Sequence, residues 1–163
     1  MIEERDGWFV VNVKNAQWHG TPAFGRVCSF EDRDKPFEQV GIRIYVLEPG
    51  KSNCRYHRED AQENFLVLSG ECKMLVNGEE RPLKSWDFVY CPPGVTHVFV
   101  GSGQGPCAIL AMGHRPVDDI FYPASEMARQ YNAETPEPTA EPKIAYSDVP
   151  RWEKTETPEW PLG

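Results

Sequence analysis

The sequence lacks long apolar runs and basic clusters, and each absence excludes a class of function. No apolar stretch among its 163 residues approaches the roughly 18 residues of a membrane-spanning helix. Lys and Arg number 17 against 25 Asp and Glu, which gives a formal net charge of -8, so nucleic acid and anionic membranes are not expected partners. The acidic start, MIEERDGWFVVNV, is also unlike a secretory signal.

Cysteine pairs of the CxxC type are missing as well. The odd number of cysteines favours reduced thiols in a cytoplasmic protein, most of them packed as small apolar side chains. The five are Cys28, Cys54, Cys72, Cys91 and Cys107. Nothing in the sequence indicates a nucleophile triad, a glycine-rich phosphate loop or the paired carboxylates of a glycosidase.

The composition is 40% hydrophobic and 12% aromatic, which fits one compact domain with a real core. Between residues 7 and 112, short apolar runs alternate with turn signals, and no helical periodicity interrupts them. Asn77-Gly78 lies between KMLV and EERPL and predicts a tight hairpin. About eight strands at this spacing predict an all-β fold, an antiparallel sandwich or barrel.

The C-terminal part, residues 123–163, differs from this pattern. PASEMARQYN, at its start, predicts a short helix with Ser125 as the N-cap. The six prolines that follow Glu134 predict a segment without regular structure. That segment nevertheless holds apolar side chains as far as Trp160, so we expect an extended arm that packs on the preceding domain, residues 1–122, or on a neighbouring subunit. The alternative is a floppy tail.

Two motifs surround the central histidines. The first has the form G(x)nHxHxxxE(x)6G, with one substitution, and its positions are Gly50, His57, Glu59, Glu63 and Gly70. The second, G(x)5PxGxxHxxxN, corresponds to WDFVYCPPGVTHVFVG, with Pro92, Gly94 and His97 in register. Both motifs, in order and properly spaced over about residues 40–112, resemble the cupin superfamily.

The resemblance implies a jelly-roll β-barrel that forms a homodimer and binds one divalent transition metal ion (Fe, Mn, Ni or Zn). It places the ligands at His57, Glu59, Glu63 and His97. Three positions depart from the family pattern. Glu59 replaces the second His of the first motif, Trp86 replaces the initial Gly of the second motif, and Gly101 replaces its final Asn. The last two departures indicate backbone and packing changes, whereas the first concerns the metal site.

The spacing of the ligands agrees with this hypothesis. His57 and Glu59 are two residues apart, so both side chains point to one face of an extended strand. Four ligands would leave two of six coordination positions open for water, substrate or oxygen, as a catalytic metal requires. We favour Glu59 as a ligand, which would suit harder ions such as Mn(II) and Fe(II). The alternative is that Glu59 pairs with Arg55 or Arg58 and leaves a two-His-one-carboxylate triad.

The predicted function is that of a metalloenzyme acting on a small organic molecule by oxygenase- or isomerase-type chemistry, with Glu63 and Glu59 as candidate catalytic groups. The alternative is a non-catalytic binding or sensing module, with a structural metal or none. A lumen filled by side chains such as Phe88 would favour that alternative. His19 and His114 are expected in surface loops. Candidate pocket residues are Arg43, Tyr45, Gln62, Phe65 and Phe99.

Overall fold

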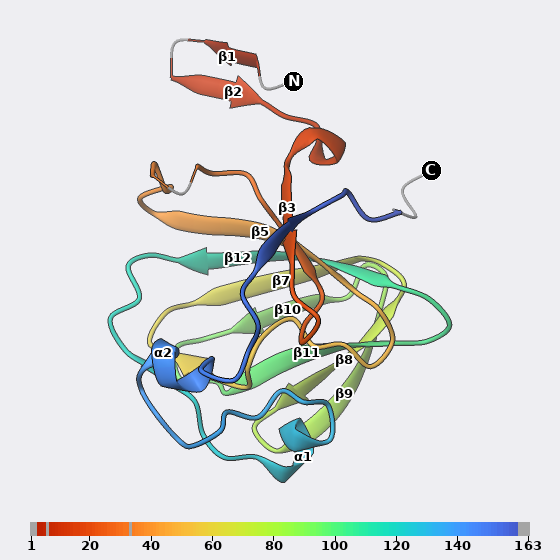
Figure 1. Ribbon diagram of the computed structural model, residues 1–163, viewed down its shortest axis with the longest axis vertical. Helices are drawn as coiled ribbons and strands as arrows, with labels where there is room; N and C mark the ends of the chain where they lie inside the picture. The colour runs from red at the N-terminus through yellow and green to blue at the C-terminus, as the bar shows by residue number, and fades with distance from the viewer. Residues whose placement is uncertain (1–2, 6, 33, 160–163) are drawn as a thin grey trace.

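The computed structural model describes residues 3–5, 7–32 and 34–159 (Figure 1). Its larger sheet consists of β3 (Gln17–Gly20), β4 (Arg26–Ser29), β5 (Val40–Leu47), β7 (Glu63–Ser69), β10 (Phe88–Cys91), β12 (Cys107–His114) and β14 (Glu153–Thr155). Its smaller sheet consists of β8 (Glu71–Val76), β9 (Glu79–Lys84) and β11 (His97–Ser102). The strand orders are β10-β7-β12-β5-β4-β3-β14 and β11-β8-β9, and all neighbours are antiparallel.

Two small sheets and three short helices complete the described elements. The small sheets are β1 (Glu3–Arg5) with β2 (Trp8–Val10), and β6 (Arg58–Glu59) with β13 (Ile120–Phe121). The helices are η1 (Val13–Asn15), α1 (Glu126–Arg129) and α2 (Pro142–Ala145). None of the described helices is long and apolar enough to cross a membrane.

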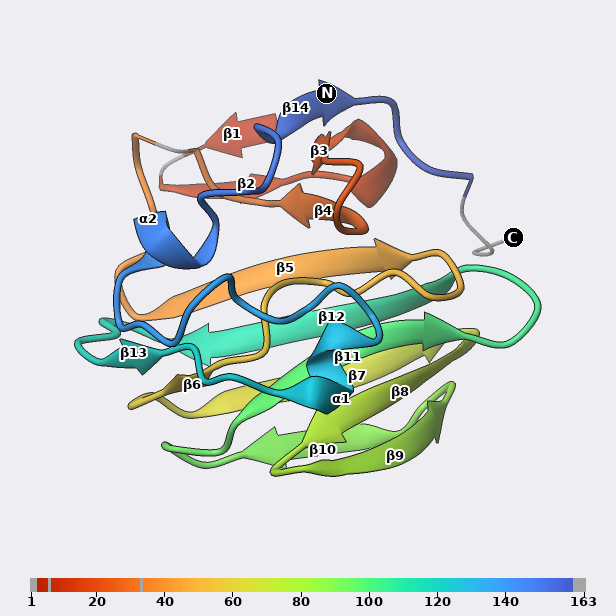
Figure 2. The ribbon, with the colours of Figure 1, turned by 60° about the horizontal axis from the view of Figure 1, so that its bottom comes forward.

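The two large sheets enclose the main core between them (Figure 2). Alternate residues of β7, Phe65 and Val67, point inward and meet Met74 of β8 and Phe99 of β11 in one buried cluster. Alternation of this kind buries one face of each strand, and each large apolar side chain removed from water contributes about 1.5–3 kcal/mol. The all-β antiparallel prediction is therefore confirmed.

The hairpin between β8 and β9 forms where the sequence predicts it. Asn77 and Gly78 both adopt positive φ, 47° and 86°, the conformation that a two-residue hairpin turn needs. β3 was not predicted, and His19 lies within this strand rather than in a surface loop. β3 pairs with β4 and β14, and its Trp18 is buried in a second core cluster on the larger sheet.

The C-terminal segment is more regular than the prolines indicate. The predicted helix is present as α1, with the Ser125 side chain accepting a hydrogen bond from the Ala128 amide at 3.1 Å. The prediction that no regular structure follows is wrong: Pro142 occupies the first turn of α2, where its missing N–H costs nothing, and β14 pairs with β3. Trp160 lies outside the described residues.

Arg55 fastens this segment to the barrel. Its buried guanidinium donates hydrogen bonds to the carbonyls of Asn132 and Ala145, each at 3.1 Å, and to that of Glu134. It also pairs with Asp148. A buried cation requires such partners, so the segment is held by polar contacts as well as by apolar packing. The expected arm therefore packs on its own barrel.

The departures at Trp86 and Gly101 have backbone explanations. Trp86 has φ 74°, a left-handed conformation that favours glycine, which accounts for the glycine of the family pattern. Gly101 lies against the backbone of the segment after β5, where an added Cβ would come within 2.3 Å of the Glu48 carbonyl oxygen. Asparagine, the family residue, therefore does not fit at position 101.

Candidate metal centre

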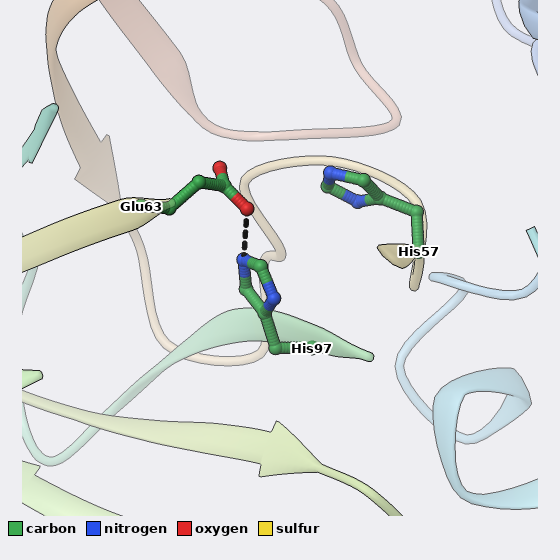
Figure 3. A group of neighbouring side chains, drawn as sticks. All are labelled: His57, Glu63 and His97. Carbon is green, nitrogen blue, oxygen red and sulfur yellow. Dashed lines mark ion pairs between the residues drawn. The ribbon is translucent and has the colours of Figure 1, made fainter. Parts of the chain in front are cut away.

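Three of the four predicted ligands converge inside the barrel (Figure 3). His57 precedes β6, Glu63 begins β7 and His97 begins β11. Each offers one ligand atom, and these atoms all lie within 4.8 Å of one another. The backbones of His57 and His97 also bond to each other in both directions, at 2.8 and 3.2 Å, which brings the two imidazoles together.

Both imidazoles are oriented by backbone carbonyls. Nδ1 of His57 lies 2.8 Å from the Arg55 carbonyl, and Nδ1 of His97 lies 3.0 Å from the Val95 carbonyl. Because a carbonyl can only accept, each Nδ1 carries the hydrogen and donates it. The Nε2 atoms are thereby directed at the acids: that of His97 is 3.3 Å from Glu63 Oε2. This second-layer bonding is the arrangement by which proteins present histidine to a metal.

Glu59 lies beside this group of three. Its Oε1 is 3.4 Å from Nε2 of His57, and its side chain is largely buried. Among the described residues it forms no ion pair with Arg55, whose guanidinium holds the C-terminal segment, and Arg58 pairs instead with Asp119 at 3.3 Å. Glu59 thus faces the imidazoles, and its role as a fourth ligand remains a prediction.

The protonation of this cluster reflects its crowding. Burial and the neighbouring Glu59 charge raise the pKa of Glu63 to about 7. Burial, with the nearby His57 charge, lowers the pKa of His97 to about 4. Burial also opposes protonation of His57, yet Cys54 and the carboxylates of Glu59 and Glu63 raise its pKa well above the usual value. Packed acids and imidazoles that compete for protons form a donor set that suits a divalent cation.

A cavity of about 250 Å³ adjoins the cluster and contains all four predicted ligands in its lining. Arg43, Tyr45 and Phe65 also line it, as the sequence predicts. The prediction is wrong for Phe99, which is fully buried beneath Phe65, with ring centroids 4.5 Å apart. It is also wrong for Gln62, whose exposed side chain turns away and donates to Asn64 at 3.3 Å.

Several lining residues were not predicted. Tyr122 follows β13 and Tyr146 follows α2. The Tyr122 ring lies 5.6 Å from that of His57 and 5.8 Å from that of Tyr146. His114 is exposed, as expected, but it ends β12 and lines the cavity instead of lying in a loop. These residues carry no local motif, because their places depend on contacts with distant parts of the chain.

The structure resembles many solved proteins at low sequence identity. A cupin 2 domain-containing protein from Halorhodospira halophila is 19% identical, with a TM-score of 0.56 over 81% of this chain and 88% of that protein. The polyketide cyclase RemF from Streptomyces resistomycificus is 14% identical, with a TM-score of 0.58 over 68% of this chain and 82% of that protein. A sugar phosphate isomerase of the cupin superfamily from Silicibacter pomeroyi is 24% identical, with a TM-score of 0.54 over 63% of this chain and 66% of that protein.

A search of the curated proteins finds no match to the sequence. Residues 43–113, however, match the family described as cupin domain. This match spans both motifs and every residue of the three-ligand group. Residues 43–113 are thus similar to a cupin domain both in their two motifs and in the family match, and the barrel has the fold of its structural neighbours.

Proposed function

We propose that the barrel holds one divalent transition metal ion and that the protein is a metalloenzyme acting on a small organic molecule. The observation that carries this proposal is the direction of the two imidazoles: both Nδ1 atoms are bonded to carbonyls, and both Nε2 atoms face carboxylates. His57, Glu63 and His97 would hold the ion, with Glu59 as the fourth ligand. Nitrogen and carboxylate donors in this ratio suit Fe, Mn, Ni or Zn.

The space beside the ligands supports catalysis over a purely structural site. The cavity is not filled by the three phenylalanines that could have closed it, because Phe65 forms a wall, Phe99 lies in the core and Phe88 points to solvent with 61% exposure. A structural metal site is closed by protein ligands, whereas a catalytic one leaves room for substrate. The non-catalytic binding or sensing module is therefore the second choice.

The reaction we propose is of oxygenase or isomerase type. A bound metal ion would supply Lewis acidity or oxygen activation at this position. Glu63, with its pKa raised to about 7, is suited to accept or hold a proton near neutral pH, and Glu59 is its neighbour for the same task. The fold does not choose between the two reactions, because one fold supports different chemistries: its neighbours include a polyketide cyclase and a sugar phosphate isomerase.

Elemental analysis of protein purified without an affinity tag or chelator tests the metal site. We expect about one equivalent of Fe, Mn, Ni or Zn per chain, with marked loss in Glu63→Ala and in His97→Ala. His19→Ala, on β3 outside the cavity, is the matched control and should retain the metal. Absence of metal after reloading, or full metal content in both ligand variants, would contradict the proposal.

Oxygen-consumption and isomerisation assays with small hydroxylated substrates then separate the reaction types. If the metal-loaded protein converts no substrate in either assay, the non-catalytic binding module would be favoured. The protein's cysteines support the cytoplasmic location that we also propose, because all five are free thiols, as expected in a reducing compartment.

A further inference from the structure

Arg43 is a cation in the cavity without an acidic partner. It forms no ion pair with any carboxylate that the structure describes, although the charges of Glu31 and Glu59 are near enough to be felt. Its exposed side chain interacts with the Tyr45 hydroxyl. Arg43 and Tyr45 are two residues apart on β5, so both face the lumen.

The other arginine of the cavity provides a contrast. Arg115 is bound by both carboxylate oxygens of Glu31, at 2.6 and 2.8 Å, and donates to the Phe37 carbonyl at 2.9 Å. This fork-shaped pairing neutralises Arg115 and fixes it to the wall. Arg43 therefore supplies the uncompensated positive charge among the arginines that line the cavity.

The charges of the metal-loaded cavity leave room for one anion. The two imidazoles would bind as neutral groups, and the carboxylates of Glu59 and Glu63 would balance a divalent ion. The Arg115–Glu31 pair is neutral. Arg43 then leaves a net charge of about one positive unit, which a monoanionic substrate would cancel.

We propose that the substrate of this site carries a carboxylate, which Arg43 and Tyr45 bind while another oxygen of the same molecule faces His57, Glu63 and His97. This inference rests on the proposed function, because it assumes a metal-loaded cavity. A planar guanidinium matches a carboxylate with two parallel hydrogen bonds, and the Tyr45 hydroxyl adds a third donor. A phosphate dianion would overcompensate the single free cation, so a carboxylate fits the charge better.

Isothermal titration of the metal-loaded protein tests this. The probes are two carboxylates with their neutral amides, 3,4-dihydroxybenzoate with 3,4-dihydroxybenzamide and lactate with lactamide, together with inorganic phosphate. At least one carboxylate should bind about tenfold or more tightly than its amide, because a charged hydrogen-bond pair contributes about 1.5–3 kcal/mol. Arg43→Gln should remove this preference, and Arg43→Lys should keep part of it.

The matched control is Arg26→Gln, on the neighbouring strand β4 and outside this cavity, which should leave carboxylate binding unchanged. Elemental analysis of each variant separates the two proposals. Metal-loaded protein that binds amides as tightly as carboxylates, binds phosphate more tightly, binds none of the probes, or keeps its preference in Arg43→Gln overturns the substrate inference alone. Wild-type protein that retains no metal overturns the proposed function.

Discussion

The backbone carbonyl of Arg55 accepts a hydrogen bond from Nδ1 of His57 at 2.8 Å, while the Arg55 guanidinium binds the C-terminal segment. One residue thus orients a predicted metal ligand through its main chain and anchors the last quarter of the fold through its side chain. The position of the segment and the orientation of the imidazole are therefore coupled.

Replacing Arg55 by Met should lower the free energy of unfolding by about 3 kcal/mol, because the buried Ala145 carbonyl and the part-buried Asn132 carbonyl lose their donor. Chemical denaturation measures this, and limited proteolysis should cut more readily after residue 132. Arg58→Met is the control: it removes a partly exposed pair with Asp119 and should cost less than about 1 kcal/mol. Equal losses in both variants would show that Arg55 is not an anchor.

Glu59→His should increase the affinity for Cu(II) or Ni(II) relative to Mn(II) by about tenfold or more, because imidazole is a softer ligand than carboxylate. Competition titrations of metal-free protein measure the ratio. Asp60→His places a histidine one residue away on an exposed position and should leave the selectivity unchanged. An unaltered ratio in Glu59→His would mean that Glu59 does not coordinate the ion.

Metal-free protein should lose stability through Glu63 as the pH rises. A carboxyl group whose pKa is higher in the folded state, here about 7 against an ordinary 4.5, favours folding when protonated, and this contribution disappears as the pH passes through 7. Glu63→Gln should therefore gain about 2 kcal/mol over the wild type between pH 5 and pH 8.

Denaturation curves of chelator-treated protein at the two pH values measure this difference. Glu79→Gln changes an exposed carboxylate on β9 and serves as the control. A difference between wild type and Glu63→Gln that does not change with pH would contradict the assigned pKa. Added Zn(II) should stabilise the wild type more than the variant at pH 8, since the ion needs the carboxylate.

The homodimer predicted from the sequence remains a proposal, and we place its interface at β10. Trp86, Phe88 and Tyr90 expose 73, 61 and 56% of their surface at this edge of the larger sheet. An edge strand has free backbone groups that can pair with the same strand of a second copy. Trp86 keeps a strained left-handed backbone conformation although its side chain is largely exposed. A partner subunit that covers this side chain would explain both features.

Light scattering coupled to size exclusion should then show a dimer that Phe88→Lys converts to monomer. Trp8→Lys, at an exposed aromatic residue of β2, is the matched control and should remain dimeric. A monomeric wild type, or a dimer that survives Phe88→Lys, would rule out this interface.

The sequence predicted what depends on local patterns. Short apolar runs between turn signals predicted the strands now seen as β5, β7, β8 and β11. The spacing around His57 and His97 predicted residues that the structure brings together, because a motif carries the required geometry within a few residues. Phe99 was wrongly predicted to line the cavity, because strand alternation indicates which face of the sheet a side chain is on but not how deeply it is buried. The Phe99 side chain points inward and lies in the core beneath Phe65.

Contacts distant in sequence explain the remaining differences. β14 is a strand because Glu153, Lys154 and Thr155 pair with β3, more than a hundred residues earlier, and its own proline-rich surroundings argue against it. Gln62 was expected beside its neighbour Glu63, but adjacent residues on an extended chain point to opposite faces.

The residues that line the cavity are synthesised at different times. All four proposed ligands lie between residues 57 and 97, whereas Tyr146 joins the wall from a segment made some fifty residues later. During synthesis, the barrel strands and the candidate metal-binding group can therefore form while this wall is still absent. A metal ion could enter through that gap and be enclosed afterwards, when α2 docks and Arg55 receives its carbonyl partners.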